Sequence, residues 1–535
     1  MFEMKKTVFC IFYVLLSWGI SRGQTPIFQV THSNCYGGSL EEDFFHSTRT
    51  SDGGYLLTGL SDSQDGDINQ SVIYDTTNVF VVKTDSLGNK QWAKIYGGNN
   101  YDKGRFGMED ANGNYLIVGT TLSTDGDVVA NHANSEVFVM KLNSLGDIIW
   151  LRTYGGNGFE SARCILQTSD GNYLIGAYTT SPGGDVNAPH RGEHDGWIFK
   201  TDTAGNIIWS TTYGGSETDR IRWIEPLADG GYMFIGSTMS SDIDCIGNHG
   251  DHDFWIGRID SIGTLIWSKV YGGSGPEWAY HLLAEPDSTW LVTGFTGSNN
   301  NGDVSGFKGG ATDGWVIRLD ADGNLLGQKC LGGSLDDRLN RSIHGFQNNI
   351  LSVGFSQSND MDLQSLNPGG KYSFWVCSLD STLSSDWSYC TGGNLGDFGE
   401  EIFYSGSSNS ITLVGETNSY DGITSSNHGG LDMLFIRLEV TGFSSTNFTE
   451  TSPAQVYYDA NNHALVLCGY ASNKYINIEL TDLNGRSICS MKNLISTEPI
   501  TKILLPSNTL NKSGVFVTRI TSAENEVVQK IAVIK

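Results

Sequence analysis

The motif Tyr-Gly-Gly recurs along the chain at a nearly constant spacing, and this repeat limits the fold more than any other feature. YGG begins at residues 36, 96, 154, 213 and 271, and the related LGG and TGG begin at 331 and 391. The seven copies are spaced by about 59 residues. An acidic residue follows the second glycine of each copy by four positions: Glu42, Asp102, Glu160, Asp219, Glu277, Asp337 and Asp397. Such periodicity indicates one large repeat array.

Each repeat contains further segments typical of β-strands. One is apolar with a central glycine, which we expect to occupy one register in all copies: Gly59, Gly119, Gly176, Gly236, Gly294, Gly354 and Gly415. The next is centred on an apolar side chain that we expect to pack between repeats: Phe80, Phe138, Trp197, Trp255, Trp315, Trp375 and Leu434. Turn sequences such as SDGG and DTAGN separate these segments. Four antiparallel strands per repeat predict an all-β fold, a seven-bladed β-propeller.

The ends of the array predict how the propeller closes. The seventh copy lacks a convincing fourth strand, because the polar sequence TGFSSTNF follows its third strand. The segment IFQVTHSNC, residues 27–35, precedes the first copy, where a fourth strand would fall. We therefore expect the N-terminal strand to complete the last blade and remove an open sheet edge. The expected domains are a propeller at 25–440, a linker at 441–452 and a small β-sandwich at 453–535.

The N-terminus and the composition predict the cellular address. Residues 1–23 have a basic start, the apolar run TVFCIFYVLLSWGI and small residues near Gly23, as in a secretory signal peptide cleaved near that glycine. We expect no transmembrane segment in the mature chain. The formal net charge of −26 disfavours nucleic acid as a partner. We expect the eight later cysteines to be mostly free and buried, and Cys468 with Cys489 is the first disulfide to test.

The tail carries motifs of a known family. The strand INIELTDLNGRSI supplies Leu480, Asp482, Leu483, Gly485 and Arg486. The ending supplies Leu510, Gly514, Phe516, Val517, Lys530 and Ile531. Residues 453–535 therefore resemble the C-terminal sorting domain of the type IX secretion system of Bacteroidota. VYYDANNHA, residues 456–464, replaces the Tyr-Pro-Asn-Pro element with which that family usually opens.

The repeats also resemble those of secreted glycine-rich proteins of Bacteroidota. TSPGGDVNAPHRGEHDGWIF (180–199) and SSDIDCIGNHGDHDFWIG (240–257) carry this likeness. The two resemblances imply export by the signal peptide, passage across the outer membrane through the secretion machinery, and a secreted or cell-surface location.

Paired acids in the loops after the glycine strands are candidate metal ligands. Carboxylates with backbone carbonyls suit calcium, and the pairs are Asp65 with Asp67, Asp125 with Asp127, Asp242 with Asp244, and Asp360 with Asp362. The alternative is that these acids, like the acid after each YGG, accept hydrogen bonds from turn N–H groups. No cofactor other than calcium is expected. The histidines of these loops show no recurring ligand set, and we interpret them as exposed polar residues.

No contiguous catalytic motif is present, and no arginine cluster that would bind a carboxylate is evident. The leading hypothesis is a non-enzymatic surface propeller that binds a protein or glycan through its loops. The alternative is an extracellular polysaccharide hydrolase or lyase with a site in the propeller channel. Because the first strands of the fourth and fifth repeats deviate most, its candidate catalytic residues are Arg220, Arg222, Glu277 and His281.

Overall fold

The computed structural model describes residues 26–68, 76–130, 134–346, 349–364, 366–367, 370–424 and 426–443, and beyond these the strands between 455 and 533. The chain divides into two compact units, Met1–Ser445 and Thr446–Lys535. The predicted signal peptide at 1–23 and most of the predicted linker lie outside the described residues. No helix in the described part of the chain is long and apolar enough to cross a membrane.

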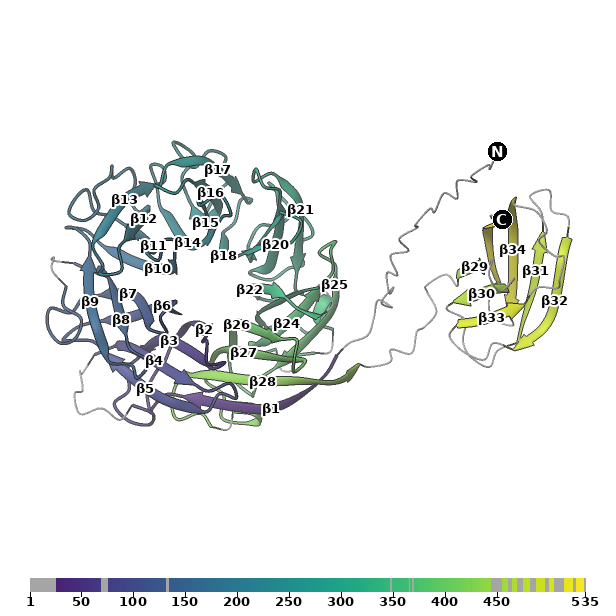
Figure 1. The fold of residues 1–535 in the computed structure, drawn as a ribbon, viewed down its shortest axis with the longest axis horizontal. Coiled ribbons are helices and arrows are strands. Elements are labelled where there is room, and N and C mark those ends of the chain that lie inside the picture. Colours follow the sequence, from purple (N-terminus) through teal and green to yellow (C-terminus); the bar gives the residue numbers. More distant parts are fainter. Residues whose placement is uncertain are drawn as a thin grey trace, which may run out of the picture. The chain divides into compact units, whose positions relative to one another are not determined.

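The first unit is a seven-bladed propeller with four antiparallel strands per blade, which confirms the predicted fold class (Figure 1). Blades one to three are β2 Phe44–Arg49, β3 Tyr55–Ser61, β4 Asn78–Thr84, β5 Lys90–Tyr96; β6 Asp102–Glu109, β7 Tyr115–Thr121, β8 Glu136–Leu142, β9 Ile148–Tyr154; and β10 Glu160–Gln167, β11 Tyr173–Thr179, β12 Asp195–Thr201, β13 Ile207–Tyr213. Blades four to six are β14 Asp219–Pro226, β15 Tyr232–Thr238, β16 Asp253–Ile259, β17 Leu265–Tyr271; β18 Glu277–Ala284, β19 Trp290–Thr296, β20 Asp313–Leu319, β21 Leu325–Leu331; and β22 Asp337–His344, β23 Ile350–Ser356, β24 Ser373–Leu379, β25 Ser385–Thr391. The short 3-10 turns are η2 Met361–Leu363 and η3 Gly422–Thr424.

The seventh blade joins the two ends of the propeller. It contains β26 Asp397–Ser405, β27 Ser410–Thr417, β28 Asp432–Phe443 and, as its outermost strand, β1 Pro26–Tyr36. The prediction that the N-terminal strand closes the last blade is therefore confirmed. β28 continues past residue 440, the expected end of the propeller, because Ile27 and Pro26 of β1 pair with Gly442 and Phe443.

The second unit contains two antiparallel sheets. One consists of β29 Gln455–Asp459, β30 Ala464–Cys468 and β33 Ile500–Leu504. The other consists of β31 Tyr475–Thr481, β32 Ser487–Ile495, β34 Gly514–Ser522 and β35 Glu526–Val533. β31, which carries Leu480 of the predicted sorting motif, lies in the second sheet between β32 and β34.

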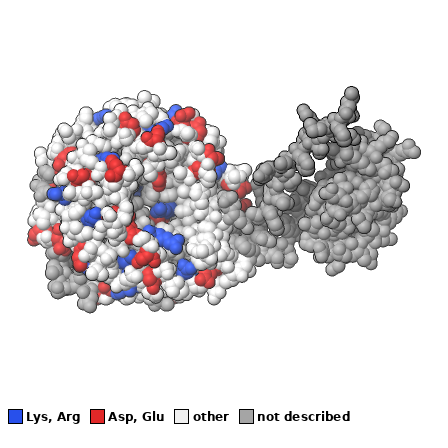
Figure 2. Space-filling model, viewed as in Figure 1, with Lys and Arg blue, Asp and Glu red and all other residues white. Residues whose placement is uncertain are grey.

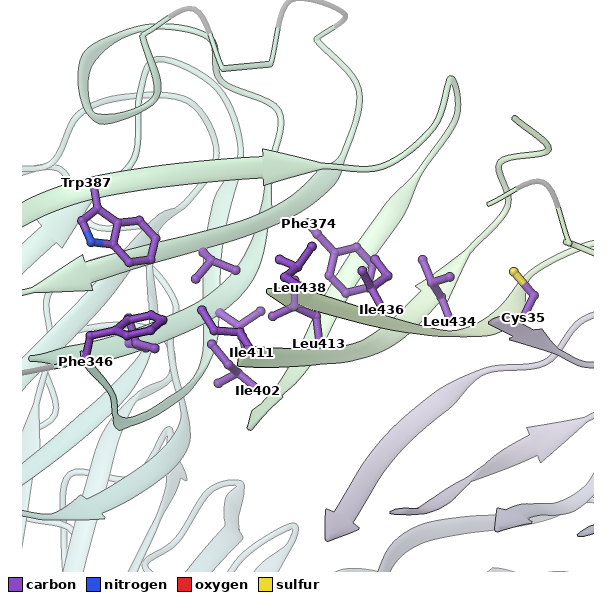
Figure 3. Close-up of a cluster of buried hydrophobic side chains, with 13 residues drawn as sticks. Cys35, Phe346, Phe374, Trp387, Ile402, Ile411, Leu413, Leu434, Ile436 and Leu438 are labelled. Atoms are coloured by element: carbon purple, nitrogen blue, oxygen red, sulfur yellow. The ribbon is translucent and has the colours of Figure 1, made fainter. Parts of the chain in front are cut away.

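The third strands pack the blades against one another, as predicted. All seven central side chains, from Phe80 to Leu434, are fully buried. At the closing joint, Phe374 and Trp387 of blade six pack with Leu434 and Ile436 of β28 and with Cys35 of β1 (Figure 3). The cysteines whose side chains the structure describes are free: Cys35, Cys164, Cys245, Cys330, Cys377 and Cys390. The side chains of Cys468 and Cys489 lie outside the described residues.

The glycine register of the second strands is correct in six blades and wrong in the third. Gly59, Gly119, Gly236, Gly294, Gly354 and Gly415 pair directly with the central residues of the third strands. In blade three, Ala177 pairs with Trp197, and Gly176 lies one position earlier. A Cβ atom on any of the six glycines would come within 1.8 to 2.0 Å of a carbonyl oxygen of the first strand or, in blade one, of the residue just before it. This close approach of backbone explains the glycine.

Candidate functional site

The first strand of every blade contains a β-bulge at the same position. The register of its pairing with the second strand skips one residue, which is left without a partner in the ladder. The skipped residues are Phe45, Arg105, Arg163, Arg222, Tyr280, Asn340 and Glu400. All of them line a cavity of about 360 Å³. The first strands surround the centre of the propeller (Figure 1), so the bulges direct one side chain per blade into the central channel.

Three adjacent blades place an arginine at this bulge position. We call Arg105, Arg163 and Arg222 the arginine arc. Within the described part of the chain, none of the three forms an ion pair or a hydrogen bond. The Arg105 guanidinium lies 4.0 Å from the centre of the Phe45 ring, and that of Arg222 lies 3.8 Å from the centre of the Tyr280 ring. Stacking occupies a guanidinium face and leaves the N–H edge available to a carboxylate.

The arginine arc concentrates positive charge in a protein of net negative charge. Burial, together with the nearby Arg163 and Arg222, lowers the pKa of Arg105 to about 9. Burial also lowers the pKa of Arg222. Figure 2 shows Lys or Arg side chains (blue) inside the central hollow of the propeller. Repulsion between these partly buried guanidinium groups favours a bound anion.

Another part of the cavity wall is formed by acids and an amide from blades one, six and seven. These residues are Asp43, Asn340, Glu400 and Glu416. Burial raises the pKa of Glu400 to about 8, although Arg222 opposes this shift. Burial also raises the pKa of Glu416, whose side chain accepts a hydrogen bond of 2.9 Å from the backbone N–H of Phe44. At neutral pH, Glu400 is therefore mostly protonated, which reduces the negative charge of this part of the wall.

Side chains next to the bulges meet across the middle of the ring. We call these six residues the floor: His46, Phe106, Trp223, His281, Arg341 and Glu401. The Trp223 ring of blade four lies 6.0 Å from His46 of blade one and 4.6 Å from His281 of blade five, measured between ring centres. The Arg341 guanidinium of blade six lies 4.9 Å from the Trp223 ring and forms an ion pair with Glu401.

The four candidate catalytic residues occupy different positions. Arg222 and His281 line the cavity, the first in the arginine arc and the second in the floor. The Arg220 guanidinium lies between the rings of Tyr178 and Trp278, 5.2 and 5.8 Å from their centres, and is not among the cavity-lining residues. Glu277 is fully buried in the turn between blades.

Glu277 and its counterparts hold the connections between blades together. Each carboxylate accepts a hydrogen bond of 2.6 to 3.0 Å from the backbone N–H of the second glycine of its motif. Each is fully buried, and each also accepts hydrogen bonds from Ser or Thr hydroxyls at the end of the second strand, as Asp337 does from Ser356 and Ser358. The acid after each YGG therefore caps backbone and hydroxyl groups, as the capping interpretation expects.

The calcium candidates also contact turn backbone. Asp65, Asp125, Asp242 and Asp360 accept hydrogen bonds of 2.7 to 2.9 Å from the N–H groups of Ser39, Asn99, Ser216 and Ser334. The side chains of Asp67, Asp244 and Asp362 accept hydrogen bonds from the backbone N–H of the first glycine of a motif. In Asp127 it is the backbone N–H that donates, to the carbonyl oxygen of Gly97. Among the described residues, no group of three or more His, Cys, Asp or Glu side chains is arranged to hold a metal ion. Calcium binding stays a prediction.

Three loop histidines share an arrangement that the sequence analysis missed. The Nδ1 atoms of His190, His249 and His428 lie 3.0, 3.0 and 2.8 Å from the first acid of a third strand, which is Asp195, Asp253 or Asp432. The spacing of four or five residues between each histidine and its acid is the signal that could have revealed this pairing. These histidines tie the loop to the blade.

The arginine arc was not predicted from the sequence either. The three arginines each follow the acid of their repeat by three positions, in DKGR, ESAR and DRIR. An alignment of the repeats on that acid would have brought them together. It would not have shown that this position is the bulge, because the other blades have Phe, Tyr, Asn and Glu there.

No protein-family description matches the chain, and no curated protein matches its sequence. Solved structures that it resembles include the WD40 domain of Neurospora crassa Pan2, with 10% identity, a TM-score of 0.42 and coverage of 79% of this chain and 98% of that one. They also include puromycin hydrolase, with 10% identity, a TM-score of 0.42 and coverage of 81% and 60%. Hydrazine synthase of Kuenenia stuttgartiensis has 12% identity, a TM-score of 0.36 and coverage of 85% and 97%. These likenesses concern the propeller fold and carry no information on function.

Proposed function

We propose that this protein is an exported binding protein whose central channel holds an anionic ligand. The observation that carries the proposal is the arginine arc, three guanidinium groups from adjacent blades in one cavity without a carboxylate partner among the described residues. The three arginines are partly buried, and charges withdrawn from water are normally paired, so an unpaired cluster in a cavity favours a ligand that supplies the missing negative charge.

The cellular address of the proposal comes from the sequence. The signal-peptide pattern of residues 1–23 and the sorting-domain motifs of residues 453–535 support export through a type IX-like system of Bacteroidota. The secretion machinery is then the partner of the second unit, and the propeller acts outside the cell, secreted or on the cell surface. A reporter that carries residues 1–23 at its N-terminus and residues 453–535 at its C-terminus tests export: it should reach the medium or cell surface of a bacterium that has this system.

Binding to a glycan array that includes neutral, carboxylated and sulfated members tests the ligand class, followed by calorimetry with the best ligand. We expect anionic members to bind and neutral ones to fail. Arg163→Gln and Arg222→Gln should each weaken binding by about tenfold or more, since each removes a buried charge contact. Arg152→Gln is the matched control, because Arg152 is exposed and donates only to the Ala204 carbonyl. Equal binding by all four proteins would contradict the proposal.

A second candidate function is hydrolysis or elimination of an acidic polysaccharide in the same cavity. The observation that favours it is Glu400, whose pKa of about 8 makes it a proton donor at neutral pH. Release of new reducing ends or unsaturated sugars from acidic polysaccharides would reveal this activity. Under this hypothesis Glu400→Gln abolishes turnover while binding persists, whereas a pure binding protein shows no turnover in either form.

A further inference from the structure

We propose that the cavity recognises the end of an acidic sugar chain, with the carboxylate of the terminal residue on the arginine arc and its hydroxyl groups on the opposite polar wall. This inference rests on the proposed function and specifies its ligand. Two features carry it: the floor, which closes the channel, and the chemical difference between the two walls.

The floor prevents a chain from passing through the channel. Trp223 reaches the axis from blade four and contacts side chains from four other blades: His46, Phe106, His281 and Arg341. His46 stacks on Phe106 with 3.5 Å between ring centres. Aromatic stacking and the Arg341–Glu401 ion pair hold these groups together, and His46 and His281 are each 4% exposed. A polymer can therefore insert one of its ends into the cavity but cannot thread through the channel.

The two walls next to the floor differ in the chemical groups that line them. The arginine arc presents unpaired N–H edges, which match a carboxylate in a bidentate geometry. Asn340 and Glu400, at the bulges of blades six and seven, line this wall with a carboxyl group and with an amide whose nitrogen also donates to the Gly399 carbonyl at 2.9 Å. Such groups exchange hydrogen bonds with sugar hydroxyls, which both donate and accept. A ligand with a carboxylate on one side and hydroxyls on the other is an acidic sugar.

Two further observations favour a sugar over a peptide or protein ligand. A peptide amine would need an ionised carboxylate in the wall, whereas burial raises the pKa of Glu400 to about 8 and also raises the pKa of Glu416. The cavity of about 360 Å³ lies at the small end of the range for ligand pockets, which is about 300–1,000 Å³. It suits one or two sugar residues better than a folded protein loop.

Calorimetry on the full chain with five probes tests the inference. The probes are glucuronic acid, its linear β-linked tetramer, the same tetramer with a bulky aryl group at both ends, glucose and triglutamate. We expect the free tetramer and the monomer to bind, the doubly capped tetramer to bind at least about tenfold more weakly, and glucose and triglutamate not to bind. Asn340→Ala and Arg222→Gln should each weaken binding of the monomer by about tenfold, with Arg152→Gln unchanged.

The comparison of free and capped tetramers uses the unmodified protein, so it does not depend on a variant that folds. Equal binding of both tetramers would overturn end recognition while leaving anion binding intact. Preference for triglutamate would identify an acidic peptide as the ligand and overturn the sugar assignment. Failure of every anion in this set and in the array would instead reject the proposed function itself.

Discussion

At the scale of single residues, close approach of the backbone explains the glycine in the second strand of six blades. In blade five, a Cβ atom on Gly294 would lie 2.0 Å from the Trp278 carbonyl oxygen, so alanine forces the two strands apart. We expect Gly294→Ala to lower the free energy of unfolding by about 1–3 kcal/mol. Gly327, in β21 of the same blade, has no atom within 4 Å of its Cβ position, and Gly327→Ala should be neutral within about 0.5 kcal/mol. Denaturant unfolding of the two variants tests this difference, and equal effects would contradict it.

The buried acid after each glycine motif also contributes to the free energy of unfolding. Asp337 accepts hydrogen bonds from the Gly333 N–H and from the hydroxyls of Ser356 and Ser358. Alanine leaves these buried donors without a partner, each at a cost of about 1–3 kcal/mol, so we expect Asp337→Ala to lower the free energy of unfolding by at least about 3 kcal/mol. Asp322 is exposed in a turn, and Asp322→Ala provides the control, with an expected change below about 0.5 kcal/mol. A near-neutral Asp337→Ala would show that the cap is dispensable.

At the scale of elements, β1 is the strand whose loss should most affect the stability of the propeller. It pairs with β28 along ten register positions and covers what would otherwise be a free sheet edge of blade seven. Deletion of residues 25–35 should abolish the cooperative melting transition of the propeller and cause aggregation. Deletion of residues 1–23 alone, which leaves β1 in place, should not change the transition. Circular dichroism melting and size-exclusion chromatography distinguish the two outcomes, and a normal melting curve without β1 would disprove its role in closure.

The strands and their bulges differ in how well the sequence predicts them. Strand number, blade number and closure follow from the 59-residue period, because turn glycines and apolar alternation mark every strand. No sequence pattern marks the bulge. The seven bulge residues do not share one residue type, and a residue skipped in the pairing of two strands leaves the apolar alternation of the sequence unchanged. The shared position of the three arginines could be read from aligned repeats, but their direction into the channel could not. Gly176 was placed in the wrong register because the third blade shifts its glycine by one position.

At the scale of the whole molecule, buried carboxyl groups make stability depend on pH. Burial raises the pKa of Asp102 to about 6, of Glu277 to about 7 and of Asp313 to about 8, and all three are fully buried. A raised pKa in the folded state means that the folded protein binds protons more tightly than the unfolded chain. The stabilising contribution is therefore lost as pH rises through these values.

The window from pH 8.5 to 6.5 spans the titration of these carboxyl groups. His46 and His281 have pKa values lowered by burial, so they stay neutral in the folded state above pH 6.5. Glu400 and Glu401, whose pKa values burial raises to about 8 and about 7, add to the effect, whereas Lys103, whose pKa burial lowers to about 7, opposes it. Lowering the pH from 8.5 to 6.5 should raise the free energy of unfolding by on the order of 2–3 kcal/mol through protonation of these buried carboxyl groups. Asp313→Asn imitates the protonated carboxyl group, so it should melt higher than the unmodified protein at pH 8.5 and flatten the dependence. Differential scanning calorimetry at four pH values measures both effects. A melting temperature that falls from pH 8.5 to 6.5 would mean that the buried carboxyl groups are ionised and compensated in the folded state.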